Sequence, residues 1–208
     1  MFYIKSTFKF SKQASQYIIN FYLKVFENYF IHDLMDNLPR NFFITPPGKE
    51  LREYFLKLNI IDKIDKVQVF VSNSKNWYKG NPHLDLTWNN PPKIIKSRFN
   101  ILILGDPFDK MHWWGHMNTI DQLTIQEFTY LNGSKYKSYA VPGTTVENRW
   151  EYLAEPTLSV ANLILGSAFV KTNCVHTVNV SPGPRLILTV LLKDSIENIF
   201  DDKITEIL

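Results

Sequence analysis

Cysteine is almost absent from the 208-residue chain, which contains Cys174 alone. A single thiol excludes an internal disulfide framework and fits a reducing compartment. Runs of about 18 apolar residues are also missing, so no segment is expected to span a membrane. The first ten residues lack an apolar core followed by a small-residue cleavage site, and no signal peptide is predicted. From these absences we expect a cytoplasmic protein.

The chain has no strong charge of either sign. Its net charge is +3 and its computed pI about 8.8. Lys and Arg are scattered rather than gathered in a stripe, so nucleic-acid binding is not favoured. Hydrophobic residues make up 45% and aromatics 14%, which excludes disorder over most of the length. With no internal repeat or obvious linker, residues 1–208 are expected to form a single domain.

The first third of the sequence has helical periodicity. Apolar residues in the segment 11–36 recur at three- and four-residue spacing, and Ser11 is placed to cap this helix. A second helix is predicted over residues 47–58, directly after prolines. Residues 1–62 are therefore expected to form a helical support region.

From about residue 66 the pattern changes to short strands. Eight runs rich in β-branched or aromatic residues are separated by Pro, Gly, Asn or Asp, with no helical pattern between them. Such a series favours an antiparallel jelly roll over a parallel α/β sheet, here across residues 63–194. Residues 132–157 are long and polar, as in a lid, and residues 195–208 form a tail or short helix. The eight runs are 66–72, 83–88, 98–105, 124–131, 158–165, 167–173, 176–181 and 185–192.

Three residues on these strands could hold a metal ion. His83 and Asp85 are two apart, so in a strand both side chains point to the same face. Together with a distant imidazole, for which His176 is the natural candidate, they would form the facial triad of a non-haem Fe(II) site. The alternatives are a hydrogen-bonded pair at a strand edge for His83 and Asp85, and a core histidine for His176.

Arg185 lies nine residues beyond His176, after the turn sequence at 181–184. If the two flanking runs are adjacent antiparallel strands, Arg185 and His176 can face the same interior. An inward guanidinium in an apolar strand requires an anion. A small dicarboxylate would satisfy it, and so would a structural ion pair with an Asp or Glu.

This combination resembles the Fe(II)/2-oxoglutarate-dependent oxygenases, in particular the prolyl/aspartyl-hydroxylase type. The motif His83-Leu84-Asp85, the later His176 and the following Arg185 match the family pattern, and the resemblance spans roughly residues 80–192. It implies a double-stranded β-helix (a cupin-like jelly roll) flanked by helices. It also implies Fe(II) on the triad, 2-oxoglutarate on Arg185 and O2 as oxidant. Halogenase relatives replace the acid of the motif, so the intact Asp85 favours hydroxylation, with release of succinate and CO2.

Four further residues are candidates for the site. Family members place a polar residue on the strand after the acid as a second cosubstrate anchor, a role that Asn100 or Arg98 could fill, although an outward Arg98 is equally consistent. Trp113 and Trp114 could line a substrate mouth, while His112 and His116 beside them are expected at the rim or surface. Cys174 is expected to be a buried structural thiol.

The substrate is open from sequence: a small molecule or a peptidyl group, with an amino-acid or peptidyl side chain favoured by family analogy. Two other classes compete with an enzyme, namely a non-catalytic jelly-roll binding module and a structural or assembly protein. No membrane partner is expected, and the oligomeric state is undetermined.

Overall fold

The computed structural model describes most of the chain. It covers residues 1–28, 34–74, 78–79, 82–86, 93–106, 109–117, 123–129, 135–141, 156–161 and 166–200.

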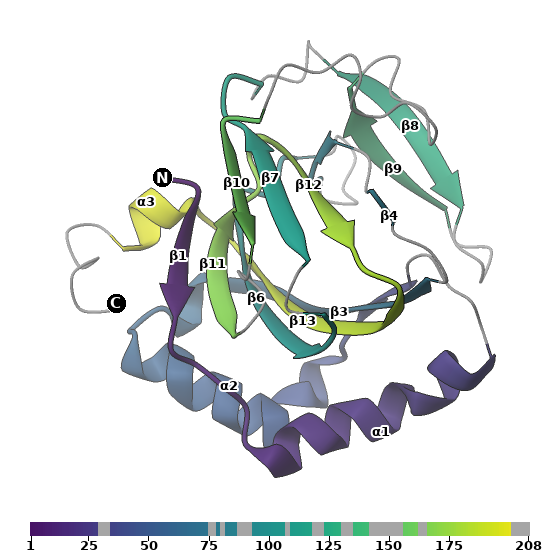
Figure 1. Cartoon of the computed structure of the whole chain (residues 1–208). Helices are drawn as coiled ribbons and strands as arrows, with labels where there is room; N and C mark the ends of the chain where they lie inside the picture. Colours follow the sequence, from purple (N-terminus) through teal and green to yellow (C-terminus); the bar gives the residue numbers. More distant parts are fainter. Residues whose placement is uncertain are drawn as a thin grey trace.

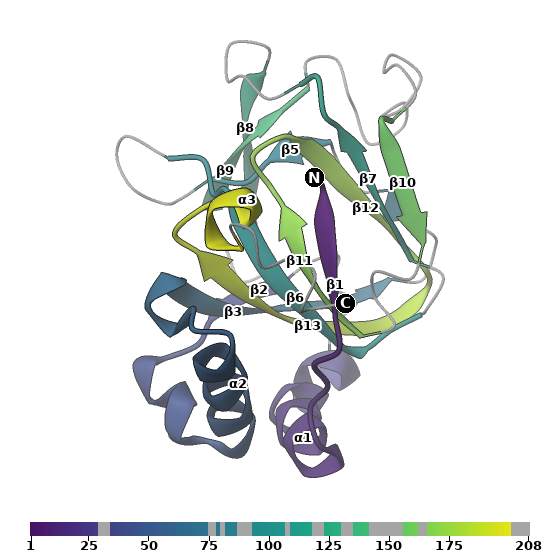
Figure 2. The ribbon, with the colours of Figure 1, turned by 90° about the vertical axis from the view of Figure 1, so that its left-hand side faces the viewer.

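Two antiparallel β-sheets form the body of the protein and face each other (Figures 1 and 2). The mostly β architecture is compatible with the expected jelly roll. In spatial order, the first sheet contains β1 (Tyr3–Ser6), β11 (Ser167–Lys171), β6 (Ser97–Leu104), β13 (Gly183–Leu192), β3 (Ile64–Ser74) and β2 (Leu34–Asn37). The second contains β10 (Leu158–Ala161), β7 (Lys110–Trp114), β12 (Val175–Val180), β5 (His83–Leu84), β9 (Lys135–Ala140) and β8 (Thr124–Thr129), and β4 (Tyr78–Lys79) pairs with β12.

Strand β13 lies at the centre of the first sheet, between β6 and β3. Leu186, Leu188 and Val190 are fully buried in the core shared with the helices. Side chains alternate between the two faces of a strand, so Arg185 and Ile187 face the space between the sheets instead. The strand is nearly all apolar because both of its faces are covered.

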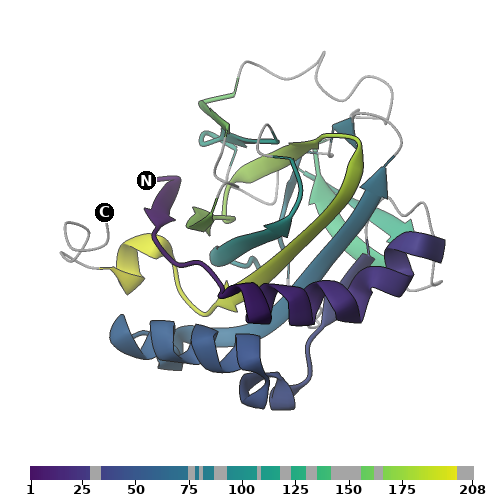
Figure 3. The same ribbon diagram turned by 60° about the horizontal axis from the view of Figure 1, so that its bottom comes forward.

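Helices cover the outer face of the first sheet. Helix α1 (Lys12–Asn28) and helix α2 (Pro46–Lys57) lie side by side beneath it (Figure 3). Phe55 and Leu51 are fully buried between α2 and the sheet. Short helical elements complete the described chain: η1 (Arg40–Ile44), η2 (Ile61–Lys63) and α3 (Ile196–Ile199).

Side-chain caps start the two longer helices. Ser11 Oγ accepts a hydrogen bond from the Ala14 amide at 3.1 Å, which confirms the predicted cap. Thr45 Oγ1 accepts one from the Gly48 amide at 3.4 Å, ahead of prolines whose fixed φ suits a first turn. Helix α2 begins and ends within one residue of the predicted range 47–58.

The N-terminal third is less helical than predicted. Helix α1 is described over Lys12–Asn28, and residues 34–36 of the predicted helix 11–36 belong instead to strand β2, which pairs with β3. Residues 3–6 form β1, which pairs with β11 from the far end of the sequence. The expectation of a helical support region over residues 1–62 is therefore not confirmed as stated, because strands from this region complete both ends of the first sheet.

Three described strands of the second sheet were not anticipated. Strand β4 occupies residues 78–79, β7 occupies residues 110–114, and β9 lies inside the segment 132–157 that was interpreted as a lid. The rest of that segment falls outside the described residues, apart from 141 and 156–157, as does the tail beyond residue 200. No helix in the described part of the chain is long and apolar enough to cross a membrane.

Candidate metal centre

Two neighbouring strands bring the candidate imidazoles together. His83 on β5 and His176 on β12 are direct partners in the antiparallel ladder, and their ring centroids are 4.9 Å apart. Asp85 follows β5, and its carbonyl oxygen accepts a hydrogen bond from the Ile95 amide at 2.9 Å. The backbone is thus tied on both sides of the His-X-Asp motif, which holds the two side chains of the motif beside His176.

The three side chains form a compact set of metal-ligating atoms. One atom from each of His83, Asp85 and His176 can be chosen so that all lie within 4.8 Å of one another. Asp85 Oδ1 lies 3.5 Å from His83 Nε2, and Oδ2 lies 3.7 Å from His176 Nε2. Both distances exceed an ordinary N–H···O hydrogen bond, which suits an ion between the groups. The donor set of two imidazoles and one carboxylate is the one that non-haem Fe(II) sites use.

Burial gives the set a closed side and an open side. The side chains of His176 and Asp85 are 6% and 14% exposed, whereas that of His83 is 33% exposed. An ion held here would therefore be reached from the side of His83.

The protonation states also suit metal binding. His176 Nδ1 hydrogen-bonds the Cys174 carbonyl at 3.0 Å, which requires Nδ1 to carry the proton and leaves the Nε2 lone pair directed at Asp85. Burial, partly offset by the charge of Asp85, lowers the pKa of His176 to about 4. Burial raises the pKa of Asp85, but Arg98 and the two histidines outweigh it and hold that pKa well below its usual range. At neutral pH the carboxylate is charged and the His176 imidazole neutral.

This burial predicts a pH dependence for the metal-free protein. Unfolded His176 takes up a proton near pH 6.5, whereas the folded residue does so only near 4. Between these values the unfolded chain binds more protons, so stability should fall as the pH drops from about 6.5 to 4, by up to about 3 kcal/mol. Urea unfolding in chelator-treated buffers measures the change. A His176→Gln variant should show a flatter profile over this window, and identical slopes for the two proteins would contradict the assignment.

Arg98 contacts the candidate ligand directly. It is 7% exposed, and its Nε donates a hydrogen bond to Asp85 Oδ2 at 2.5 Å. Its Nη1 donates to Gln68 Oε1 at 3.0 Å. The sequence suggested a cosubstrate anchor or an outward side chain for Arg98, and the structure instead places it on the carboxylate of the triad.

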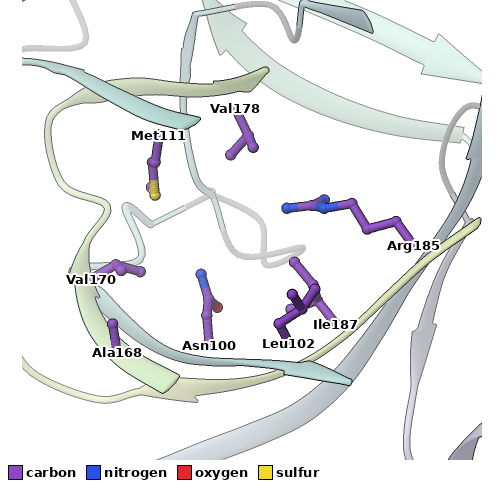
Figure 4. Close-up of a pocket in the computed structure, with 8 residues that line it drawn as sticks. All are labelled: Asn100, Leu102, Met111, Ala168, Val170, Val178, Arg185 and Ile187. Atoms are coloured by element: carbon purple, nitrogen blue, oxygen red, sulfur yellow. The ribbon is translucent and has the colours of Figure 1, made fainter. Parts of the chain in front are cut away.

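A cavity lies between the two sheets (Figure 4). Val178 is two residues from His176 on β12, and Asn100 is two residues from Arg98 on β6, so the cavity continues along the same strand faces as the triad. Its lining residues are Asn100, Leu102, Met111, Ala168, Val170, Val178, Arg185 and Ile187.

Asn100 and Arg185 provide the polar groups of this otherwise apolar cavity. Thr189 Oγ1 donates to Asn100 Oδ1 at 2.6 Å, which leaves the amide nitrogen directed into the cavity, as Figure 4 shows. The guanidinium of Arg185 points into the same space from β13. Two nitrogen donors in an apolar cavity suit a ligand with oxygen acceptors, most of all an anion.

Arg185 already has a carboxylate beside it. Asp109, which is 1% exposed, places Oδ2 3.1 Å from Arg185 Nε. Asp109 Oδ2 and Arg185 Nε form an ion pair but no hydrogen bond with each other. Asp109 Oδ1 instead accepts from the Ser181 amide and hydroxyl at 2.6 and 2.8 Å. The structural ion pair weighed for Arg185 is therefore present, on the Nε side of the guanidinium.

Gly105 leaves room for the Arg185 side chain, which passes directly over it. Its φ is +151°, and a Cβ there would lie 3.3 Å from Arg185 Cγ and 3.0 Å from Leu102 Cδ1. A glycine is therefore needed at this position both for the backbone conformation and for the space.

The aromatic pair does not form a substrate mouth. Trp113 and Trp114 are both fully buried, on opposite faces of β7, so the prediction that they line an opening is wrong. The indole of Trp113 donates to the Lys171 carbonyl at 2.9 Å. His112, expected near the surface, is 7% exposed and hydrogen-bonds Ser159 Oγ at 2.7 Å, whereas His116 is exposed as predicted.

Sequence reasoning missed two residues that support the site, Gln68 and Asp109. Gln68 had a usable signal, because it is the one polar residue in the apolar run at 67–71. Asp109 had none, because nothing in the loop around it indicates a partner 76 residues later.

No family model and no curated protein sequence matches the chain. Among solved structures, it is similar to the viral collagen prolyl hydroxylase of Paramecium bursaria Chlorella virus-1, solved as its 2OG complex. Identity is 12% and the TM-score 0.44, over 92% of this chain and 95% of that one. The epimerase SnoN was solved with Fe3+, alpha ketoglutarate and nogalamycin RO. Its sequence identity to this chain is 10% and the TM-score is 0.48, over 91% of this chain and 77% of the SnoN chain.

Escherichia coli ycfD gives 12% identity and a TM-score of 0.43 over 81% of this chain, which spans only 35% of the ycfD chain. In this chain, His83, Asp85 and His176 form a set of side chains that could hold a metal ion.

Proposed function

We propose that the protein is an Fe(II)- and 2-oxoglutarate-dependent dioxygenase that hydroxylates a C–H bond of an amino-acid or peptidyl side chain. The observation that carries this proposal is the triad of His83, Asp85 and His176, buried on one side, beside an apolar cavity that contains Arg185 and Asn100. A metal site and an anion site next to each other suit a chelating dicarboxylate.

The triad would hold the metal on one face. Nε2 of His176 is preset by its bond to the Cys174 carbonyl, and Asp85 is ionised at neutral pH. Three protein ligands leave about three positions of an octahedral ion open. Bound there, Fe(II) supplies the activation of dioxygen, which no side chain can perform.

The cavity would bind and orient the cosubstrate. The guanidinium of Arg185 points into the cavity and has five N–H donors, so it can pair with the distal carboxylate of 2-oxoglutarate. Asn100 would donate a further hydrogen bond from the neighbouring strand β6 of the same sheet. The apolar walls exclude water from the reacting end and strengthen both interactions.

The substrate would approach from the side of His83, the most exposed ligand. In the proposed reaction, one oxygen atom of O2 enters the new hydroxyl group and the other enters succinate, while CO2 leaves. The choice of an amino-acid or peptidyl side chain follows the family resemblance of the sequence, and a free small molecule is the alternative.

Anaerobic titration of the metal-free protein with Fe(II) and 2-oxoglutarate tests the proposal. The parent should develop the visible absorption band of the chelate, and admission of O2 should release succinate. His176→Ala should weaken metal binding more than about 100-fold, because it removes a ligand rather than a supporting group.

The exposed His116 offers a matched control, and His116→Ala should behave like the parent. A folded parent that develops no band would sink the proposal and favour a non-catalytic jelly-roll binding or assembly protein. Unchanged metal binding in His176→Ala would show that the triad is assigned wrongly.

A further inference from the structure

We propose that Arg98 is a positioning residue that holds one oxygen of Asp85, so that the carboxylate offers a single oxygen to the metal. This inference rests on the proposed metal site. It concerns a side chain that is not itself a ligand.

The contact between Arg98 and Asp85 is close and buried. Arg98 Nε lies 2.5 Å from Asp85 Oδ2, and the two side chains are 8% and 14% exposed. The same oxygen lies 3.7 Å from His176 Nε2, whereas Oδ1 faces His83. Charged hydrogen bonds of this kind are stronger than neutral ones. Oδ2 is therefore committed to the guanidinium, and Oδ1 is the oxygen left for an ion.

Further contacts fix the guanidinium itself. Nη1 of Arg98 donates to Gln68 Oε1 at 3.0 Å, and Gln68 Nε2 donates to Asn37 Oδ1 at 2.8 Å. The second bond sets the amide so that its oxygen faces Arg98. The Phe70 ring lies below, with its centroid 5.5 Å from Arg98 Cζ.

These contacts run across the first sheet. Arg98 is on β6, Gln68 on β3 and Asn37 on β2, so the side chain of Arg98 reaches past β13 to its second partner. Gln68 is 1% exposed, and a buried amide in an apolar strand is costly unless both of its ends are satisfied. Its two bonds satisfy them, and the planar fork of arginine spans Asp85 and Gln68 where a single ammonium group could not.

The consequence concerns the number of open positions on the metal. A carboxylate that binds through both oxygens occupies two positions, and one that binds through a single oxygen occupies one. A single bound oxygen leaves about three positions for ligands and dioxygen, and two bound oxygens leave about two. A chelating cosubstrate alone would occupy two coordination positions. A position for dioxygen would therefore depend on the hydrogen bond from Arg98 to Asp85 Oδ2.

Counting water molecules on bound Mn(II), by the relaxation rate of water protons, tests this without any turnover. The parent should hold about three waters and Arg98→Gln about two. Arg98→Lys should recover the third water only in part, because it restores a charged donor near Oδ2 but cannot also bond Gln68. Lys96→Gln removes a neighbouring cation from the exposed pair with Asp194 and should leave the count unchanged.

Loss of Arg98 leaves Asp85 without its cation, so the variants are folded and measured with Mn(II) present, which compensates that charge. Gln68→Leu provides a second route, because it removes the acceptor that aligns the guanidinium and should also lower the water count. Three waters in Arg98→Gln and Gln68→Leu alike would overturn the inference while leaving the metal site intact. A parent that binds no Mn(II) would instead sink the proposed function.

Discussion

Asp85→Ala should abolish metal binding and weaken the metal-free fold at the same time. The substitution removes the only carboxylate of the triad, so affinity for Fe(II) or Mn(II) should fall more than about 100-fold. It also removes the charged partner of Arg98, whose side chain is 7% exposed and forms an ion pair with Asp85. An unpaired buried charge costs about 3–5 kcal/mol, so the melting temperature should drop by several degrees or more.

Metal content after dialysis and thermal unfolding measured by circular dichroism would record the two effects separately. Asp62→Ala is the matched control, because Asp62 is 70% exposed in a surface ion pair with Lys63. That variant should keep both metal and stability. Retention of one equivalent of metal by Asp85→Ala would remove the triad as the binding site.

Arg185→Met should uncouple cosubstrate binding from metal binding and destabilise the protein. Without Arg185, the carboxylate of Asp109 remains 1% exposed with no cation at Oδ2. The expected loss of stability is about 3–5 kcal/mol. The concentration of 2-oxoglutarate needed for the visible band should rise more than about tenfold, because the cavity loses its charged donor. Mn(II) affinity should stay near that of the parent.

A double variant separates the two roles of Arg185. Asp109→Asn keeps an oxygen that can accept from the amide and hydroxyl of Ser181 but removes the charge. Combined with Arg185→Met, it should restore most of the lost stability and none of the cosubstrate affinity. Full recovery of the band in the double variant would show that Arg185 serves the fold alone.

The His83–Asp85 pair could be proposed from sequence because its spacing is local. The two residues are two apart in a strand-like run, and His176 lies in a run with clear strand character. The backbone ladder then places His83 opposite His176, which no single segment encodes. The partner of Arg185 could not be predicted, because Asp109 lies in a loop and reaches Arg185 only through the packing of the two sheets.

Errors in the fold have a common physical origin. Strands β1 and β2 lie at the two ends of the first sheet, where pairing with β11 and β3 outweighs weak local preference. Strand β7 was missed because its two tryptophans were interpreted as the lining of a substrate mouth, yet both faces of this strand are buried. Contacts with distant parts of the chain, rather than local propensity, decide each case.

The lone thiol beside the metal site has a practical meaning. Cys174 is 1% exposed, and burial raises its pKa to about 11, so the nucleophilic thiolate is scarce in the folded state. A peroxide or alkylating reagent can attack it only after the strand that leads into His176 has opened. Because the chain contains no second cysteine, the rate of thiol labelling under native conditions reports how often the region around Cys174 and His176 opens.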